Sequence, residues 1–138
     1  MKLLAALILL SAIPDDLASR FGDWLSTNLG RPYVWGATGQ KSYDCSGFVW
    51  RMLHDHGIMI KRTTARKLYM STKPLAPGET LEFGTLVFFD DLKHVGIVRD
   101  KDTFFHAQFG TGTTHSPFAP YWRSKIVAYH KLPVAASE

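Results

Sequence analysis

The sequence is poor in cysteine, and Cys45 is the only one among its 138 residues. A lone cysteine cannot form an internal disulfide, and zinc sites built from two or more cysteines are excluded as well. A domain of this size buries about two-thirds of the surface that its unfolded chain exposes, so it needs neither kind of cross-link in order to fold. The thiol is therefore either an inert buried side chain or a reactive group.

Long hydrophobic runs are also lacking. The apolar stretch at residues 3–10 is much shorter than the about 20 residues of a membrane-spanning helix. Lys2 precedes it and Ser11 follows it, which is the order of a short secretory signal, and the alternative is an apolar helix packed on the domain or on a partner. We therefore separate residues 1–13, an apolar segment suited to a membrane or a protein partner, from residues 14–138, which we predict to form one domain.

Neither sign of charge dominates, because 16 lysines and arginines stand against 12 aspartates and glutamates. The net charge of +4 favours anionic partners, among which nucleic acid and the bacterial cell wall both qualify. Hydrophobic residues make up 46% of the chain and charged residues 20%, which excludes a disordered, collagen-like or coiled-coil protein.

Helical patterns come first along the chain and strand patterns second. Apolar residues at helical spacing predict a helix that begins at a capping Asp15 or Asp16 and ends at Gly30, and two further helices are predicted from Asp44 or Cys45 to Gly57 and over residues 63–70. Short β-type runs follow at residues 86–89, 94–98, 103–107, 113–116 and 126–129. This order predicts an α+β fold in which the amino-terminal helices pack on a carboxy-terminal antiparallel sheet of about five strands.

The only thiol falls at the amino terminus of the second predicted helix, where Asp44 is available as a cap. Free backbone amides and the positive end of the helix dipole lower the pKa of a cysteine in such a place, and the same amides can bind an oxyanion. The alternative is that Cys45 is a small buried hydrophobic residue.

Two of the six histidines are placed for chemistry. His54 and His56 fall near the predicted end of the helix that starts at Cys45, and His130 falls in a polar tail, so we expect these three to be inert. His94 and His106 belong to successive predicted strands, and a turn centred on Asp100 would set them opposite each other on one face, since their numbers sum to 200. A base and the residue that orients it are the corresponding roles, and the alternative is a pair of satisfied polar residues in a sheet.

Six sequence blocks identify a relationship. They are residues 31–36 (RPYVWG), 43–49 (YDCSGFV), 62–64 (RTT), 84–89 (GTLVFF), 94–98 (HVGIV) and 105–107 (FHA). In this order they resemble the NlpC-type family of bacterial cell-wall cysteine peptidases, which have a reduced papain-like fold. The resemblance implies that Cys45 is the nucleophile, His94 the base and His106 the residue that orients it.

The resemblance also implies a substrate site and an activity. Tyr33 matches the tyrosine near the reacting carbonyl, and Asp44, Ser46 and Arg62 match positions on the oxyanion and substrate side of the cysteine. The expected reaction is hydrolysis of peptidoglycan stem peptides at D-γ-glutamyl-diamino acid bonds through a thioester, without metal or cofactor. Nucleic acid is then not an expected partner, and the expected location is periplasmic, secreted or virion-associated. The alternatives are an amidase or acyltransferase on the same scaffold, or a wall-binding or virion tail module.

Overall fold

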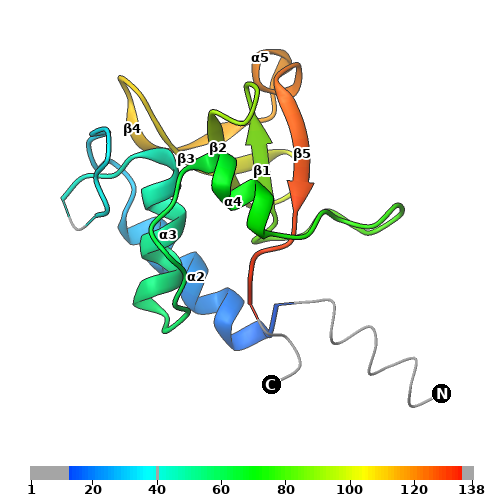
Figure 1. Cartoon of the computed structure of the whole chain (residues 1–138), viewed down its shortest axis with the longest axis horizontal. Coiled ribbons are helices and arrows are strands. Elements are labelled where there is room, and N and C mark those ends of the chain that lie inside the picture. The colour runs from blue at the N-terminus through cyan, green and yellow to red at the C-terminus, as the bar shows by residue number, and fades with distance from the viewer. Residues whose placement is uncertain (1–12, 40, 135–138) are drawn as a thin grey trace.

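The computed structural model describes residues 13–39 and 41–134, so the predicted apolar segment lies outside the described residues except for Ile13. The helices are α2 (Asp15–Thr27), α3 (Cys45–Asp55), α4 (Ala65–Ser71) and α5 (Pro120–Arg123). The strands are β1 (Leu86–Phe89), β2 (His94–Val98), β3 (Thr103–Gln108), β4 (Gly112–Pro117) and β5 (Ile126–His130). They form one antiparallel sheet in the order β4-β3-β2-β1-β5, which confirms the predicted α+β fold (Figure 1).

The three predicted helices are present, with one error in the capping of the first. Pro14 is the residue that precedes α2, and it makes no side-chain cap, so neither Asp15 nor Asp16 caps this helix. Both carboxylates lie instead in the first turn, where they interact favourably with the helix dipole. The helix ends at Thr27, before Gly30, because the chain leaves the helix through Asn28.

The five predicted strands are confirmed, and the structure adds one element that we did not predict. The short helix α5 lies between β4 and β5, and its first position is Pro120, a residue well suited to a helix start. Four residues are too few for a hydrophobic period to appear in the sequence. In Figure 1, α5 lies at the end of the molecule where the chain turns into β5.

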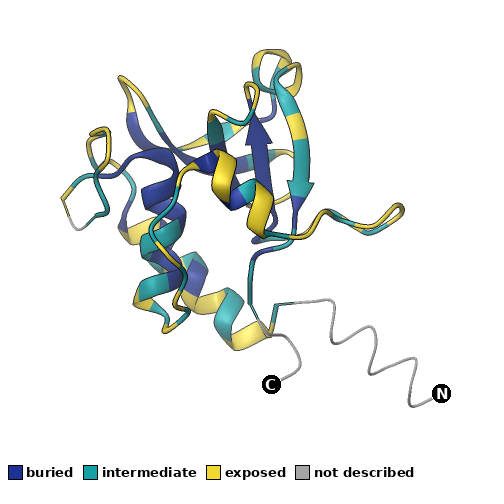
Figure 2. Cartoon of the chain, viewed as in Figure 1, coloured by how far each residue is buried: buried dark blue, intermediate teal, exposed yellow. Residues whose placement is uncertain are grey.

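The sheet separates two apolar clusters. The larger one lies between the helices and one face of the sheet, and its sheet side includes Val95, Ile97, Phe105 and Ala107. The smaller one lies on the other face, where Phe89, Phe104 and Phe118 are buried and Trp122 of α5 packs against them. Figure 2 shows the dark, buried residues concentrated in α3 and the central strands. This central position fixes the beginning of α3 relative to β2.

His130 differs from the prediction of a polar tail. It is the last residue of β5, it is 3% exposed, and its Nδ1 lies 2.9 Å from Thr72 Oγ1. Its ring also packs against Tyr69 and Phe88, so it ties β5 to the segment after α4.

None of the helices in the described part of the chain has the length and apolar character needed to cross a membrane.

Candidate active site

The thiol lies at the start of α3, as predicted. Asp44 is the N-cap, and its Oδ1 accepts a hydrogen bond of 2.6 Å from the Gly47 amide. Cys45 is therefore the first helical residue, and it is buried, with 8% of its surface exposed. Gly47 has no room for a side chain, because a Cβ atom there would collide with the Ala37 carbonyl oxygen and come within 2.8 Å of Asp44 Oδ1.

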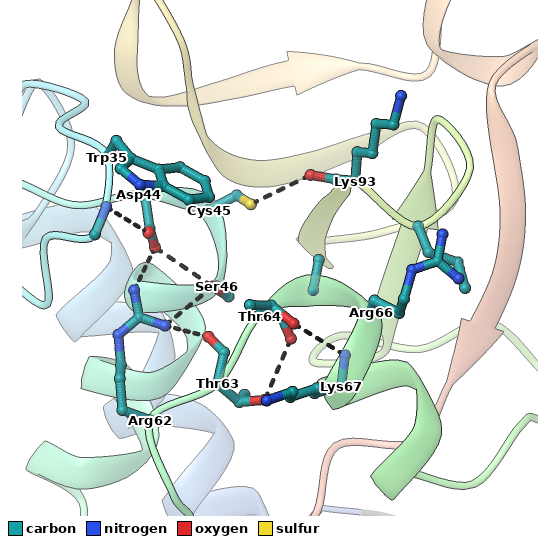
Figure 3. A pocket seen from close by; sticks show the side chains of 13 residues that line it. Trp35, Asp44, Cys45, Ser46, Arg62, Thr63, Thr64, Arg66, Lys67 and Lys93 are labelled. Carbon is teal, nitrogen blue, oxygen red and sulfur yellow. Dashed lines mark hydrogen bonds and ion pairs between the residues drawn. The ribbon is translucent and has the colours of Figure 1, made fainter.

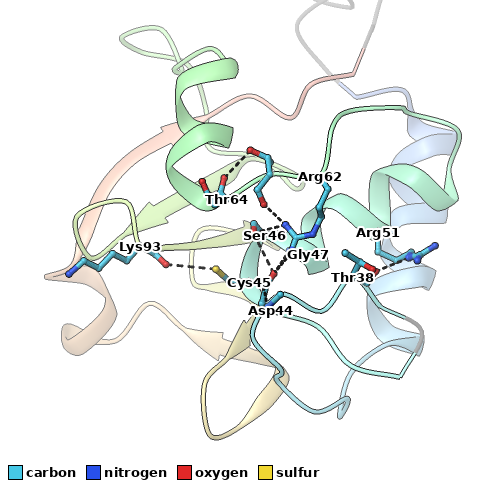
Figure 4. A network of polar contacts seen from close by, with 11 residues as sticks. Thr38, Asp44, Cys45, Ser46, Gly47, Arg51, Arg62, Thr64 and Lys93 are labelled. Carbon is cyan, nitrogen blue, oxygen red and sulfur yellow. Dashed lines mark hydrogen bonds and ion pairs between the residues drawn. The ribbon is translucent and has the colours of Figure 1, made fainter.

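The Asp44 carboxylate organises the surroundings of the thiol rather than facing the cavity with a free oxygen. Its Oδ2 accepts from the Gly36 amide at 2.9 Å, and its Oδ1 accepts from Arg62 Nη2 at 2.8 Å (Figure 4). Arg62 Nη1 donates to Ser46 Oγ at 3.1 Å and to the Thr63 carbonyl oxygen. Three segments that are separate in the sequence are thereby joined at the beginning of α3.

The two candidate histidines are neighbours on one face, but not in the predicted register. β2 and β3 pair Ile97 with Phe105 and Val98 with Phe104, so paired positions sum to 202 rather than 200. The turn is centred on Lys101, since Asp100 Oδ1 accepts hydrogen bonds of 2.9 Å from the Asp102 and Thr103 amides. The odd loop length is right, and the predicted centre at Asp100 is wrong by one residue.

This register makes His94 and His106 diagonal neighbours. His106 lies beside Gly96, where a Cβ atom would come within 3.4 Å of His106 Cβ and 2.9 Å of the Phe104 ring. Because Gly96 has no side chain, the two imidazoles meet across it, and His94 Nε2 lies 2.8 Å from His106 Nδ1. His106 Nε2 in turn lies 2.8 Å from Ser116 Oγ on β4. The result is a chain of three polar side chains across three strands.

The Cys45 thiol lies beside the beginning of β2. Cys45 Sγ lies 3.8 Å from the Lys93 carbonyl oxygen, and the Val95 amide also donates toward the sulfur. His94 stands between these two residues, and its ring packs on Phe89 and Trp122, which belong to the smaller cluster on the sheet face away from α3. Among the described residues no hydrogen bond joins Cys45 Sγ to the His94 ring, and His94 Nδ1 has no partner.

Burial raises the pKa of the Cys45 thiol, and the Asp44 carboxylate adds to this rise. The amides of Val95, Ser46 and Cys45 itself lower the pKa but do not offset burial, so the expectation of a lowered pKa is wrong for the resting site. Burial likewise raises the pKa of Tyr33, and the charges of Cys45 and Asp44 add to it. Tyr33 therefore lies close enough to the thiol to sense its charge, and its hydroxyl stays a donor.

Burial lowers the pKa of His94 to about 4 and that of His106 to about 3, while Asp90 opposes the shift at His94 and the neighbouring His94 adds to it at His106. Both rings are therefore neutral at pH 7. The resting site combines a neutral thiol with a neutral imidazole pair.

The two histidines should make folding stability depend on pH. Their folded pKa values lie below the ordinary 6.5, so the unfolded chain binds more protons, and stability is full above about pH 6.5 and falls toward pH 4. When the pH is lowered from 7 to 5, we expect each ring to lower the free energy of unfolding by about 2 kcal/mol. Urea titration measures this change. The double variant His94→Gln/His106→Gln should lose most of this dependence, and an unchanged pH profile in that variant would contradict the assignment.

A cavity of about 740 Å³ opens beside the thiol (Figure 3). Its lining consists of Trp35, Gly36, Asp44, Cys45, Ser46, Arg62, Thr63, Thr64, Ala65, Arg66, Lys67, Leu92 and Lys93. Trp35 is 82% exposed among these lining residues. Of the candidate site residues, the described lining includes Asp44, Cys45, Ser46 and Arg62.

Tyr33, His94 and His106 are not among the lining residues of this cavity. The ring of Tyr33 packs edge-on against Phe109, which is 84% exposed. Within residues 13–39 and 41–134, no group of three or more His, Cys, Asp or Glu side chains could hold a metal ion.

Sequence reasoning missed two residues beside the histidine pair, Ser116 and Trp122. Ser116 falls inside a correctly predicted strand, two residues after Thr114, which pairs with His106, so both side chains point to the face of His106. Trp122 belongs to α5, which the sequence did not reveal.

Known proteins resemble this chain over most of its length. The model of the NlpC/P60 family matches residues 30–131. A Bacillus subtilis protein named probable peptidoglycan endopeptidase LytE is 32% identical over 103 residues, which cover 72% of this chain and 30% of that protein. A Haemophilus influenzae protein named probable endopeptidase is 32% identical over 100 residues, which cover 67% of this chain and 61% of that protein. The chain thus spans less than two-thirds of either relative.

Solved structures show the same fold. A Staphylococcus aureus lipoprotein-like member of the NLP/P60 family superposes with a TM-score of 0.76 at 25% identity, over 87% of this chain and 42% of that one. RipD from Mycobacterium tuberculosis, described as a non-catalytic NlpC/p60 domain protein, has a TM-score of 0.69 at 15% identity, over 86% of this chain and 98% of that one. The family match covers most of the chain and includes the thiol and both histidines, and the chain belongs to the NlpC/P60 family.

Proposed function

We propose that residues 14–138 form a cysteine endopeptidase domain that hydrolyses peptidoglycan stem peptides, at the bond between D-γ-glutamate and a diamino acid. The observation that carries the proposal is the arrangement around β2. A buried thiol at a helix start touches the residue before His94, whose ring is held by His106. Relatives named as peptidoglycan endopeptidases support the choice of substrate.

The hydrogen-bond chain indicates which nitrogen of each imidazole carries a proton. If Ser116 Oγ accepts from His106 Nε2–H, then His106 Nδ1 accepts from His94 Nε2–H, and His94 Nδ1 is left as the free base. That nitrogen would take the thiol proton once substrate brings the two groups together, because catalytic hydrogen bonds are often long before substrate binds. The low pKa of His94 keeps this base unprotonated at pH 7.

The reaction then proceeds in two steps, formation of a thioester on Cys45 and its hydrolysis. Cys45 Sγ attacks the carbonyl carbon, the C–S bond forms, the C–N bond breaks, and His94 returns its proton to the leaving amine. Water, deprotonated by His94, attacks the carbonyl carbon of the thioester. The C–S bond breaks, the acid is released, and the Cys45 thiolate takes the proton back from His94. Amides at the start of α3 and the hydroxyl of Tyr33 are the donors proposed for the oxyanion.

The charges of the cavity suit an acidic peptide. Asp44 and Arg62 pair with each other, and Arg66 pairs with Asp91. Lys67 and Lys93 are then the cationic lining residues that remain. Stem peptides carry free carboxylates, which these side chains can attract. We place the domain outside the cytoplasm, in the periplasm or as a secreted or virion-associated protein, because its proposed substrate is located there.

The test is digestion of purified muropeptides followed by mass spectrometry. We expect two products, one that ends in the D-glutamyl carboxyl group and one with a new amino terminus on the diamino acid. Cleavage between the sugar and the first amino acid would identify an amidase, and transfer to an added amine would identify an acyltransferase. Binding without cleavage would identify a wall-binding module, and each of these three results would contradict the proposal.

Ser116 provides a milder test of this assignment of protons to the two rings. Ser116→Ala should lower kcat by about 3- to 10-fold, because one hydrogen bond of about 1 kcal/mol that selects the His106 tautomer is lost. The ¹⁵N shifts of the His106 ring should then report a mixture of tautomers. Ser124→Ala removes an exposed serine hydroxyl, which bonds to the Tyr121 carbonyl oxygen, and should leave kcat unchanged. An unaltered His106 spectrum in Ser116→Ala would refute the assignment of the ring protons.

A further inference from the structure

Trp122 stands over the histidine pair from an element that the site does not otherwise use. It belongs to α5, which starts at Pro120 and ends at Arg123. The turn is closed by a hydrogen bond of 2.9 Å from the Arg123 amide to the Ala119 carbonyl oxygen. Four residues form little helix of their own, so packing of Trp122 on the sheet holds α5 in place.

The indole contacts both imidazoles in two different geometries. Its ring is stacked on His94, with centroids 5.4 Å apart and planes 25° from parallel. It meets His106 edge to face, with centroids 5.0 Å apart and planes at 86°. Phe89 and Phe104 support the indole from the sheet, at centroid distances of 5.1 and 5.6 Å. Four rings thus fix the position of one indole.

The hydrogen bond to His106 does not by itself determine the plane of the His94 ring. It holds one nitrogen, Nε2, and leaves rotation about that contact open. A ring stacked on a second, immobilised ring has a defined plane, because tilting either ring loses the contact. The position of Nδ1 then follows from the stack.

The indole also shields the histidine pair from solvent. Trp122 is only partly exposed, and it belongs to the apolar cluster on the sheet face away from α3. On the same face, the Phe89 ring packs against His94 and the Phe104 ring packs against His106. The hydrogen bond between the imidazoles is therefore surrounded by aromatic carbon, which strengthens it relative to the same bond in water.

We propose that Trp122 is a positioning residue for the catalytic base, whose indole fixes the ring plane of His94 and keeps water away from the His94–His106 hydrogen bond. The inference rests on the proposed function of His94 as the base. It adds to that function a residue that is not among those lining the cavity.

The charged surroundings of His94 are known, so a change at Trp122 can be interpreted. Asp90, in the turn before β2, is the group that raises the pKa of His94, against the larger effect of burial. His106 lies on β3 and Cys45 on α3. On and after α5, the Arg123 guanidinium lies over the Phe118 ring and Lys125 Nζ lies over the Tyr121 ring. Substitution of Trp122 removes none of these charges.

The experiment compares Trp122→Ala and Trp122→Phe with a matched control, Trp50→Ala. Trp50 also stacks on a histidine, His54, with centroids 4.7 Å apart, and its Nε1 donates to the Ile60 carbonyl oxygen rather than contacting either candidate histidine. We expect Trp122→Ala to lower kcat about tenfold or more, with KM within about twofold, because the base loses its alignment. The acid limb of the rate profile and the NMR-measured pKa of His94 should both rise toward 6.5. Trp122→Phe should recover most of kcat, and Trp50→Ala should change neither quantity.

The outcomes separate this inference from the proposed function. The NMR titration of His94 needs no substrate, so it tests the shielding even where the wild type cleaves no stem peptide, a result that would refute the function itself. An unchanged kcat and His94 pKa in Trp122→Ala would overturn the inference, as would equal losses in Trp50→Ala. If Trp122→Ala fails to fold, Trp122→Leu keeps apolar volume without an aromatic face, and the same results are expected of it.

Discussion

Cys45→Ala is expected to abolish stem-peptide cleavage, with kcat lowered by at least about 10⁴-fold, because removal of a nucleophile leaves only binding and oxyanion contacts. The variant should fold, since alanine fills most of the volume of a buried cysteine and Asp44 still caps α3. Cleavage is measured by chromatography of muropeptides, and folding by circular dichroism. Cleavage by the variant at a tenth of the wild-type rate would exclude Cys45 as the nucleophile.

Two further measurements make this test specific to a base-activated thiol. Since Cys45 is the only cysteine, all alkylation by iodoacetamide reports on this residue. Burial raises its pKa, so at pH 7 we expect it to react more slowly than a free thiol. His94→Gln should be as inactive as Cys45→Ala while retaining the thiol, which separates loss of the base from loss of the nucleophile.

The parts of the site that the sequence predicted are those specified by local patterns. The cap at Asp44 and the helix start at Cys45 follow from adjacent residues, and the strands containing His94 and His106 follow from short apolar runs. A turn centred on one residue has an odd loop, which keeps both rings on one face, whereas a two-residue loop would have put them on opposite faces.

The parts that it did not predict depend on contacts between distant segments. The turn centre moved from Asp100 to Lys101 because the Asp100 side chain bonds the amides of Asp102 and Thr103, and this choice among turn types is not visible in strand periodicity. The pKa of Cys45 rises because the chain folds over the thiol, an effect that opposes the helix terminus. The position of Trp122 was not predicted because it depends on α5, a four-residue helix that lies between β4 and β5.

Asp44→Ala should be the most destabilising single substitution near the site, by about 3–5 kcal/mol, because it leaves the guanidinium of Arg62 without its buried partner. Asp44 is 4% exposed and accepts hydrogen bonds from the Gly36 and Gly47 amides as well as from Arg62. Removal therefore uncaps α3 and frees the segment at Gly36 together. Urea unfolding measures the loss, and cleavage should fall because the start of α3 no longer holds Cys45 in place.

An exposed ion pair of the same kind gives the control. Asp16 pairs with Arg20 at 3.2 Å, but its side chain is 86% exposed, so Asp16→Ala should cost at most about 1 kcal/mol. Asp44→Asn should lie between the two, since an amide oxygen can still cap the helix but cannot neutralise Arg62. Combining Asp44→Asn with Arg62→Met should recover part of the loss, because no unpaired charge is then left buried. If Asp44→Ala cost no more than Asp16→Ala, the carboxylate could not be what joins residues 36, 47 and 62 around the thiol.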